Sequence, residues 1–409
     1  MQTTLISINR DRLNQTLAEL ATIGQLPAGG VRRISFSPED LQARQQVKTW
    51  MQNAGMTVRV DAAGNMIGRY PGQLDLPALA TGSHIDTVPT GGRYDGALGV
   101  LAGVEGVRSL HEQQIRLRHP IEIIVFTDEE GGMIGSKAMS GNADPDPETY
   151  RRENGQEIQA CLQRIGGDWS KLDQARRSDR DIAAYVELHV EQGGVLESEH
   201  QQIGIVEGIV SLHRCDITVI GRPNHAGTTP MHLRRDAMVA AAQVVTALHE
   251  IAVNTPGRQV ATIGVVNVFP NAANIIPGQV DLVADIRDLS EEHIEGLIAQ
   301  LQERMAAIAS TTQTQITLKR GMRVQPTLAS ARVRGAIAEV CEAQQLSYGH
   351  MPSRAIHDAQ EIGRFTEMGM IFVPSVAGIS HAEDEYSSPE QCARGAMVLL
   401  QTLLKLDAL

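Results

Sequence analysis

Short apolar runs alternate with helix-length segments through the first half of the chain, and this alternation limits the possible folds more than any other feature. The runs at 57–60, 79–83, 121–126 and 184–190 have the length and β-branched content of strands, and residues 97–110 are long enough for a helix. Strands that alternate with crossover helices pair in parallel. The pattern therefore predicts an α/β fold with a mixed, mostly parallel sheet flanked by helices.

Capping signals mark the start of two helices. Ser37 is followed by proline and two acidic residues, which is typical of an N-cap and predicts a helix that ends near residue 55. Ser388 and Gln391 form a capping box that predicts a C-terminal helix. The apolar run at 369–374 predicts a further buried strand of the same sheet.

Near residue 212 the pattern changes. The predicted elements then follow the order β-α-β-β-α-β, at 215–219, 237–251, 261–269, 280–286, 294–308 and 315–319. This order predicts a ferredoxin-like α+β domain at 212–325, inserted into a larger domain made of 1–211 and 326–409. Two domains are expected in any case, because 409 residues exceed the size at which one hydrophobic core stops growing.

Charge and apolar content exclude several classes of partner. The formal net charge is −12 and no run of Lys and Arg is present, so we expect no nucleic-acid partner. The longest apolar stretches, such as 238–248, are shorter than the roughly 20 residues that span a bilayer. The N-terminus lacks the pattern of a signal peptide, so we expect a cytoplasmic protein with no membrane partner. Four scattered cysteines predict neither disulfides nor a thiolate zinc site.

The densest chemical signal is the segment SHIDTVPTGGRYDG, which follows the predicted strand at 79–83. Residues i and i+2 of a strand point the same way, so we expect Asp86 to accept the spare ring N–H of His84 and to orient that ring for metal binding. Asp95 lies in a glycine-rich loop, where a carboxylate can bridge two cations. A capped turn with solvated acids is the alternative.

Two further strand ends carry acids or histidines. The segment Asp128-Glu129-Glu130 follows the run at 121–126, and adjacent carboxylates allow one to bind metal while its neighbour takes a proton from water. His189 closes the run at 184–190. A lone acidic turn or histidine is commonly structural, so the prediction depends on these groups occurring together at several strand ends.

A fourth group is Ser380-His381, in a loop after the run at 369–374. Nitrogen and carboxylate ligands without thiolate suit Zn²⁺, Mn²⁺, Co²⁺ or Ni²⁺. We therefore predict a site for divalent metal at the carboxyl ends of the strands.

The predicted inserted domain offers polar candidates of its own. His225 lies in the turn GRPNHAGTTP, Asn274 in a second turn, and Arg287 at a predicted strand end. Arginine is the natural bidentate partner of a substrate carboxylate. The structural alternative is strong here, because Gly, Pro and Asn form turns whatever the function.

Taken together, the motifs resemble the amidase, hydantoinase and carbamoylase branch of the dinuclear M20-type metallohydrolases. That branch includes N-carbamoyl-L-amino-acid hydrolases, β-ureidopropionases and allantoate amidohydrolases. The resemblance extends from about Ser37 to the C-terminus and rests on SHIDTVPTGGRYDG, TDEEGG, ELHVEQG, GRPNHAGTTPM, NIIPG and GISHAEDEYSSPE. It implies a metal-dependent exopeptidase-like catalytic domain, an inserted dimerisation domain and a homodimer.

The resemblance also implies a role for each candidate residue. Two divalent ions, with zinc or manganese favoured, would be held by His84, Asp95, Glu130, His189 and His381. Asp95 would bridge the ions, Glu129 would be the general base and Asp86 the orienting acid. His225 would reach the scissile carbonyl from the partner subunit. Substrate contacts would come from Gln192, Asn274 and Arg287, with Arg287 binding the carboxylate.

Two departures from the family pattern concern the substrate. The segment that is usually SGAGHDA here carries Arg354 and Ile356 in place of two glycines, and the loop from Glu130 to Gly135 is several residues shorter than usual. The expected reaction is hydrolysis of the carbamoyl C–N bond of N-carbamoyl-L-amino acids. Allantoate or another ureido acid, and an N-acyl amino acid or dipeptide, are alternative substrates. A ligand-binding homologue without activity is the alternative of a different class.

Overall fold

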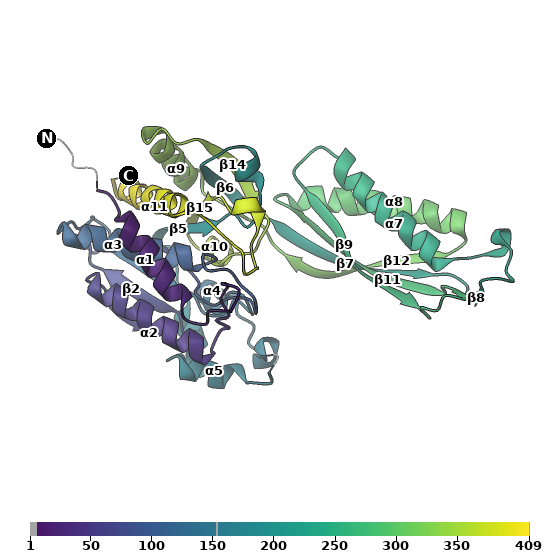
Figure 1. Cartoon of the computed structure of the whole chain (residues 1–409), viewed down its shortest axis with the longest axis horizontal. Helices are drawn as coiled ribbons and strands as arrows, with labels where there is room; N and C mark the ends of the chain where they lie inside the picture. Colours follow the sequence, from purple (N-terminus) through teal and green to yellow (C-terminus); the bar gives the residue numbers. More distant parts are fainter. Residues whose placement is uncertain (1–5, 153, 409) are drawn as a thin grey trace. The chain divides into compact units, whose positions relative to one another are not determined.

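A computed structural model describes residues 6–152 and 154–408, which form two compact units. One unit comprises Met1–Gly208 and Leu328–Leu409, and the other is Ile209–Thr327 (Figure 1). The second unit therefore begins and ends within three residues of the predicted insertion. Its start is earlier because two strands, β6 (Ile203–Ile209) and β7 (Ser211–Ile220), follow one another almost without a break.

The larger unit is built on a nine-stranded mixed sheet. Its four central strands run parallel in the order β4-β3-β5-β15, whereas the flanking pairs β1·β2, β2·β4 and β15·β6 are antiparallel. The bounds of the remaining strands are β1 Thr57–Val60, β2 Met66–Tyr70, β3 Ala78–Ser83, β4 Ile121–Val125, β5 Ile182–Val190, β13 Thr327–Leu328, β14 Tyr348–Ser353 and β15 Glu367–Val373. The predicted α/β class and mostly parallel sheet are confirmed.

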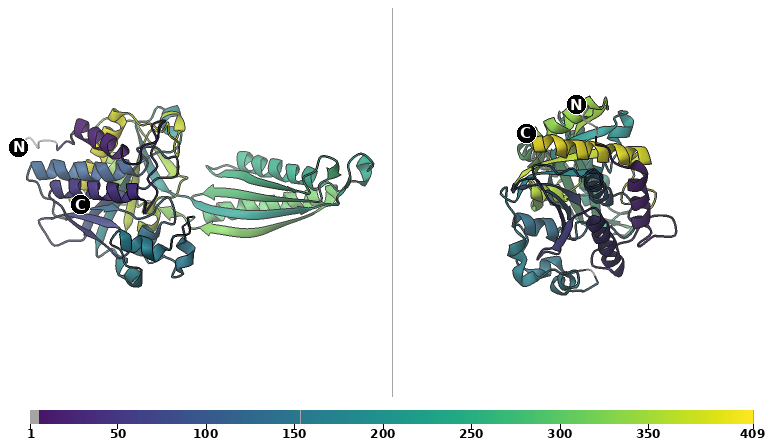
Figure 2. Two further views of the ribbon diagram at one scale, coloured as in Figure 1. Left: turned by 60° about the horizontal axis from the view of Figure 1, so that its bottom comes forward. Right: turned by 90° about the vertical axis from the view of Figure 1, so that its left-hand side faces the viewer.

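Helices cover both faces of this sheet (Figure 2). Helix α3 (Ala97–Glu112) packs on β3, β4 and β5 and also contacts α1 (Arg10–Ala21) and α11 (Pro389–Ala408), which explains why most of its residues are buried. Gly99 is required there, because a Cβ at this position would collide with the backbone carbonyl of Leu188. The other helices are α2 Pro38–Asn53, α4 Ile134–Ser140, α5 Ile158–Arg164, α6 Val195–Ser198, α9 Ala331–Ala343 and α10 Asp358–Ile362.

The two predicted helix starts are confirmed. The Ser37 hydroxyl accepts from the backbone N–H of Asp40 at 3.2 Å. Ser388 and Gln391 form the reciprocal capping box, with N···O distances of 2.6 and 3.2 Å. The cysteines are all free and buried, as predicted from their spacing.

The inserted unit is a four-stranded antiparallel sheet with α7 (Ala237–Asn254) and α8 (Glu291–Thr312) packed on one face. Its strand order, β12-β7-β11-β9, is that of a ferredoxin-like fold. The remaining strands are β9 Val260–Phe269, β11 Gln279–Asp288 and β12 Gln315–Val324, and the short pair β8 Asn224–His225 and β10 Ile275–Ile276 lies outside this sheet. The predicted β-α-β-β-α-β order is thus confirmed.

Helix α7 corrects one expectation about apolar length. It has 18 residues with a mean hydropathy of 1.3, so by length and composition alone it is long and apolar enough to cross a membrane. The helix continues for three residues beyond Ile251, where it was predicted to end, and for six residues beyond the apolar stretch 238–248. It packs against the sheet of the inserted unit, and core helices commonly pass the same test.

Candidate metal centre

Four loops at the carboxyl ends of the parallel strands bring the candidate ligands together. His84 directly follows β3, Glu130 lies in the turn after β4, His189 is near the end of β5, and His381 lies in the loop after β15. Parallel strands place their carboxyl ends at one edge of a sheet, which is where ligands bind in open α/β folds. Asp95 comes from the loop between β3 and α3.

Two groups of three ligands share Asp95. One is His84, Asp95 and His189, and the other is Asp95, Glu130 and His381, with the ligand atoms of each group within 4.8 Å of one another. Asp95 Oδ1 lies 3.1 Å from His189 Nε2 and 3.9 Å from His84 Nε2, whereas Oδ2 lies 3.1 Å from His381 Nε2. Each carboxylate oxygen therefore faces a different ligand group, as a bridging carboxylate requires.

The ring tautomers fit a cation between these groups. His84 Nδ1 lies 3.0 Å from the carbonyl oxygen of Asp86, and His189 Nδ1 lies 2.9 Å from that of Val190. A carbonyl oxygen only accepts, so Nδ1 carries the proton in both neutral rings and each Nε2 presents a lone pair. His189 Nε2 and Asp95 Oδ1 thus face one another as two acceptors, which is unfavourable unless positive charge lies between them.

A proton can meet the same demand for positive charge. Burial opposes protonation of His189, but the carboxylate of Asp95 prevails and raises the pKa of His189 to about 9. The hydrogen bond to Asp95 likewise raises the pKa of His381 to about 9. Metal binding would displace these protons. The buried Oδ1 of Asp95, which has no hydrogen-bond partner among the described residues, supports the same interpretation.

Asp86 orients the centre differently from the prediction. Its carboxylate Oδ1 is 3.6 Å from His84 Nδ1, whereas its own backbone carbonyl oxygen is at 3.0 Å. The i, i+2 argument does not apply because β3 ends at Ser83 and the motif lies beyond the strand. The carboxylate instead accepts from the Ser35 hydroxyl at 2.6 Å and from the backbone N–H of Glu130 at 3.2 Å. It therefore fixes the turn that carries Glu130.

Glu129 also lies at this centre, but it belongs to neither of the two ligand groups that share Asp95. Its Oε2 is 3.7 Å from His84 Nε2, and its side chain is 9% exposed. Burial, followed by the charges of Asp358 and Glu130, raises the pKa of Glu129 well above its usual range. A carboxylate in such surroundings holds a proton readily, which is the property required of a general base.

Burial also raises the pKa of Glu130, to about 7, with the charge of Asp95 adding to the effect. Asp128, one position before Glu129, is fully buried and bonds through both oxygens to Arg152 Nη1 at 2.6 and 2.7 Å. The backbone of Asp128 is left-handed, with φ 61°. Arg152 therefore stabilises the turn that presents the two glutamates.

Gln192 lies against the Asp95–Glu130–His381 group. Its amide nitrogen lies 3.2 Å from Asp95 Oδ2 and 3.3 Å from His381 Nε2. It was predicted as a substrate contact. In the structure it lies against the ligands themselves.

Several buried groups around the centre were not predicted from the sequence. Glu385 accepts backbone N–H groups from the loop that carries Asp95. Glu187 accepts from Ser83 and Tyr185, and the ring of His357 lies 4.5 Å from that of His189. Glu187 and Glu385 both occur inside quoted motifs, but one sequence gives no sign that they face inward.

Arg354 and Ile356, the two departures from the family pattern, are half-buried in the segment after β14. The charge of Arg354 acts on Glu191, whose carboxylate accepts from the backbone N–H groups of Val195 and Leu196 at 2.7 and 2.9 Å. Arg354 thus lies beside a carboxylate that stabilises the start of α6.

The three candidates in the inserted unit lie toward opposite ends of its sheet. His225 and Asn274 are neighbours, because β8 pairs with β10 and the Ala226 N–H donates to the Asn274 carbonyl oxygen at 2.9 Å. Both are exposed. Arg287 pairs in register with Leu212, at the other end of β11 from Gln279, and its guanidinium is bonded to Asp285 at 2.7 Å. Eight residues of strand span roughly 26 Å.

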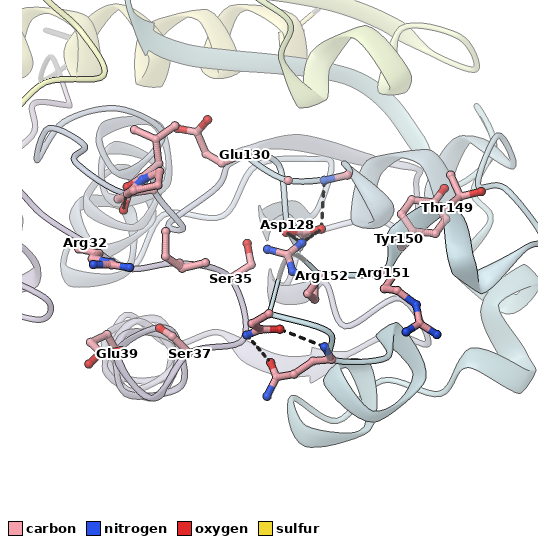
Figure 3. A pocket seen from close by; sticks show the side chains of 18 residues that line it. Arg32, Ser35, Ser37, Glu39, Asp128, Glu130, Thr149, Tyr150, Arg151 and Arg152 are labelled. Atoms are coloured by element: carbon pink, nitrogen blue, oxygen red, sulfur yellow. Dashed lines mark hydrogen bonds and ion pairs between the residues drawn. The ribbon is translucent and has the colours of Figure 1, made fainter.

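A pocket of about 800 Å³ opens beside the centre in the larger unit (Figure 3). Glu130 lies at its edge, and Arg32, Glu39 and Gln156 are among its polar lining residues. Its wall includes Gly131 and Gly132, from the loop that is shorter than the family pattern. Of the five candidate ligands, the lining of this pocket includes Glu130.

Comparison with known proteins defines the class. Residues 80–405 match the peptidase family M20/M25/M40, and the chain belongs to this metal-dependent hydrolase family. The predicted family is therefore confirmed.

More specifically, the chain is similar to named amidohydrolases along its whole length. It is 42% identical to an N-carbamoyl-L-amino acid amidohydrolase from Geobacillus stearothermophilus, covering 98% of this chain and 99% of that protein. It is 34% identical to the allantoate amidohydrolase of Escherichia coli, with coverages of 98% and 99%. A crystal structure of a hydantoinase/carbamoylase family amidase from Burkholderia multivorans superposes with a TM-score of 0.92 at 35% identity, covering 98% of each chain.

Proposed function

We propose that this protein is a two-metal amidohydrolase that cleaves the carbamoyl C–N bond of N-carbamoyl-L-amino acids. The observation that carries the proposal is the pair of ligand groups that share Asp95, with Glu129 beside them. Relatives named as N-carbamoyl-L-amino acid amidohydrolases at 34–42% identity support the substrate class. The products would be the amino acid, CO₂ and ammonia.

The side chains divide the work of hydrolysis. Bound cations would supply Lewis acidity, which lowers the pKa of a water and polarises the scissile carbonyl. Glu129 accepts the proton of the attacking water and later delivers it to the leaving nitrogen. The carbonyls of Asp86 and Val190 keep His84 and His189 in the ligating tautomer throughout. The oxygen and nitrogen donors, without thiolate, suit zinc or manganese, and also cobalt or nickel.

We further propose that the enzyme works as a homodimer. If His225 and Arg287 both contact one small substrate, they come from different copies of the chain, because His225 lies on β8, beyond the Gln279 end of β11, and Arg287 lies near the other end of β11. The inserted unit also exposes a set of large apolar side chains on α7 and β9: Met238, Val239, Val245, Val253, Val260, Val265, Val266 and Phe269. Exposed apolar clusters of this kind are typical of protein interfaces.

Allantoate and other ureido acids are the second candidate substrates. The polar pocket beside Glu130 favours this alternative, because its Arg, Glu, Ser, Asn and Gln side chains can hydrogen bond to a second ureido or amide group. The allantoate amidohydrolases of Escherichia coli and Bacillus subtilis are 34% and 35% identical to this chain. N-acyl amino acids or dipeptides are a third possibility, and binding without turnover is the alternative of a different class.

A substrate panel with metal restored distinguishes these functions. The protein is stripped with a chelator, loaded with Zn²⁺ or Mn²⁺, and assayed on N-carbamoyl-L-amino acids, allantoate, N-acetyl amino acids and dipeptides. We expect the highest kcat/KM on an N-carbamoyl-L-amino acid, and no turnover after chelation. Preference for allantoate would move the assignment to the second candidate. Binding of several compounds without hydrolysis of any would favour a non-catalytic homologue.

A further inference from the structure

Glu385 is a buried carboxylate that joins two of the ligand-bearing loops. Its side chain is among the buried groups, at 3% exposure. Oε1 accepts from the backbone N–H groups of Tyr94 at 3.0 Å and Asp95 at 3.1 Å, and Oε2 accepts from the Ser380 hydroxyl at 2.7 Å. One carboxylate therefore bonds to the residue that carries the shared ligand and to the residue directly before His381.

The loop around Asp95 is shaped to receive this carboxylate. A Cβ on Gly92 would collide with the carboxyl group of Glu385, so the glycine allows the backbone to close over it. Backbone N–H groups that are buried without an acceptor are strongly disfavoured. Glu385 thus fixes where Tyr94 and Asp95 lie, rather than filling space beside them.

The loop of His381 depends on this contact more than His84 and His189 do. His84 and His189 have Nδ1 fixed by backbone carbonyls, and His189 belongs to the central strand β5. The side chain of His381 is 49% exposed, and its backbone is left-handed at φ 53°. An exposed ligand on a loop needs an anchor to hold its ring in place, and the bond from Ser380 to Glu385 provides one.

We propose that Glu385 is a positioning residue of the metal centre, which holds Asp95 and His381 in register so that the Asp95–Glu130–His381 group binds its ion. The inference rests on the proposed two-metal centre. It predicts that loss of Glu385 lowers the affinity for this ion more than the affinity for the ion of the His84–Asp95–His189 group. Residues that orient metal ligands typically change metal affinity about 10- to 100-fold.

The test is metal binding by the full-length protein, measured with Mn²⁺ and Zn²⁺ by calorimetry and chelator competition. We expect Glu385→Ala to bind one of the two ions about 10- to 100-fold less tightly, the same ion whose binding Glu130→Gln weakens, while it retains the other. Ser380→Ala should lower the affinity for the same ion by less, because Glu385 still accepts the Asp95 N–H in this variant. Glu385→Gln keeps an oxygen that can accept from the Tyr94 and Asp95 N–H groups. Its loss of metal affinity should lie between the losses of Glu385→Ala and Ser380→Ala.

Glu105 provides a matched control. It too is a buried carboxylate, at 4% exposure, and it accepts from the Asn9 N–H at 2.8 Å, Ser109 Oγ at 3.2 Å and Arg12 Nε at 2.7 Å. Glu105→Gln should lower the melting temperature and leave both metal affinities unchanged. If Glu105→Gln lost as much metal affinity as the Glu385 variants, general destabilisation would explain the effect at Glu385.

The outcomes separate the two levels of inference. Wild-type protein that binds no pair of divalent ions contradicts the metal centre itself. Wild-type protein that binds two ions, together with folded Glu385→Ala protein of unchanged affinity for both, overturns the role of Glu385 alone. If the alanine variant does not fold, Ser380→Ala and Glu385→Gln decide: unchanged affinity in both also overturns it.

Discussion

At the scale of single residues, the ring tautomers of the histidines define the centre as much as the identity of its side chains does. The Nδ1 atoms of His84 and His189 donate to backbone carbonyls, so each Nε2 presents a lone pair. His189 Nε2 lies 3.1 Å from Asp95 Oδ1, and His84 Nε2 lies 3.7 Å from Glu129 and 3.9 Å from Asp95. Two facing acceptors are stable only with positive charge between them. The facing acceptors therefore favour a cation more strongly than the number of acidic residues does, since acidic turns are common without a cation.

Glu129 and Glu130 are adjacent and chemically alike, which makes them a matched pair for mutation. We expect Glu129→Gln to bind both ions and to lose kcat by about 10²- to 10⁴-fold, because it removes the proton acceptor without removing a ligand. Glu130→Gln should instead weaken the ion of the Asp95–Glu130–His381 group. Turnover with metal analysis on the same samples checks both, and near-normal turnover of Glu129→Gln would refute its role as base.

Asp40 gives a pH prediction that is independent of the metal centre. Burial raises its pKa from 3.8 to about 6, and its carboxylate accepts the Phe36 N–H at 2.7 Å. Between these pH values the folded state binds more protons than the unfolded state, so Asp40 makes the protein less stable as pH rises from about 4 to about 6.

Asp40→Asn retains the acceptor and removes the ionisation. We expect the variant to gain stability relative to wild type as pH rises, by at most about 3 kcal/mol above pH 6. Urea unfolding at pH 4.5 and pH 7.5 measures the difference. A variant whose relative stability is the same at both pH values would show that Asp40 has an ordinary pKa.

At the scale of elements, strands and helices with strong local signals were predictable. The parallel strands β3, β4 and β5 are short apolar runs, and α3 between β3 and β4 follows from the need for a crossover. Strands β2 and β6 were not predicted: β2 is a short run that includes Gly68 and Arg69 and pairs with β1 and β4, and β6 includes Gly204, Glu207 and Gly208 and pairs with the distant β15. Helix α1 was not predicted either; its buried face packs on α3 and α11.

The site was predictable as a set of residues, and less so as a set of contacts. Four strand ends with His or carboxylate indicated the ligands, but Asp86 was given the wrong hydrogen-bond partner because the exact end of β3 is invisible in sequence. Glu385 was missed because its main donors are the backbone N–H groups of Tyr94 and Asp95. Backbone partners leave no residue-type signal.

The two edges of the inserted sheet differ in a way that predicts which one pairs with another copy. Edge strand β9 exposes Val265 and Val266, at 43% and 46%, whereas the opposite edge β12 carries Lys319, Arg320 and Arg323. Charged side chains on an edge strand oppose edge-to-edge association, and an apolar edge permits it. We therefore expect the β9 side to form the dimer contact.

Val266→Glu should convert the dimer to monomers at micromolar concentration, because it places a charge in the apolar contact. Met322→Glu is the matched control: it is 55% exposed on β12, and the protein should remain dimeric. Light scattering coupled to size exclusion gives the mass of each. Dimers in both variants, or dissociation of the control alone, would place the interface elsewhere.

At the scale of the whole molecule, the inserted unit has a consequence for how many chains make one active site. His225 and Arg287 are separated by the length of β11 within one chain, and they cannot both touch the same small substrate there. In a dimer, one subunit could supply His225 to the substrate bound by the other. A complete active site would then require residues from both subunits.

Mixing two inactive variants tests this arrangement directly. Glu129→Gln and His225→Ala are each expected to be inactive as pure dimers, since every site lacks one of the two groups. In a mixed dimer, the subunit with intact Glu129 receives His225 from its partner, so one of two sites is complete. Random exchange makes half of the dimers mixed, and activity should return to about a quarter of the wild-type value. Differently tagged subunits, co-purified and analysed by mass spectrometry, establish that exchange occurred. No regain in verified mixed dimers would mean that His225 acts within its own chain or not at all.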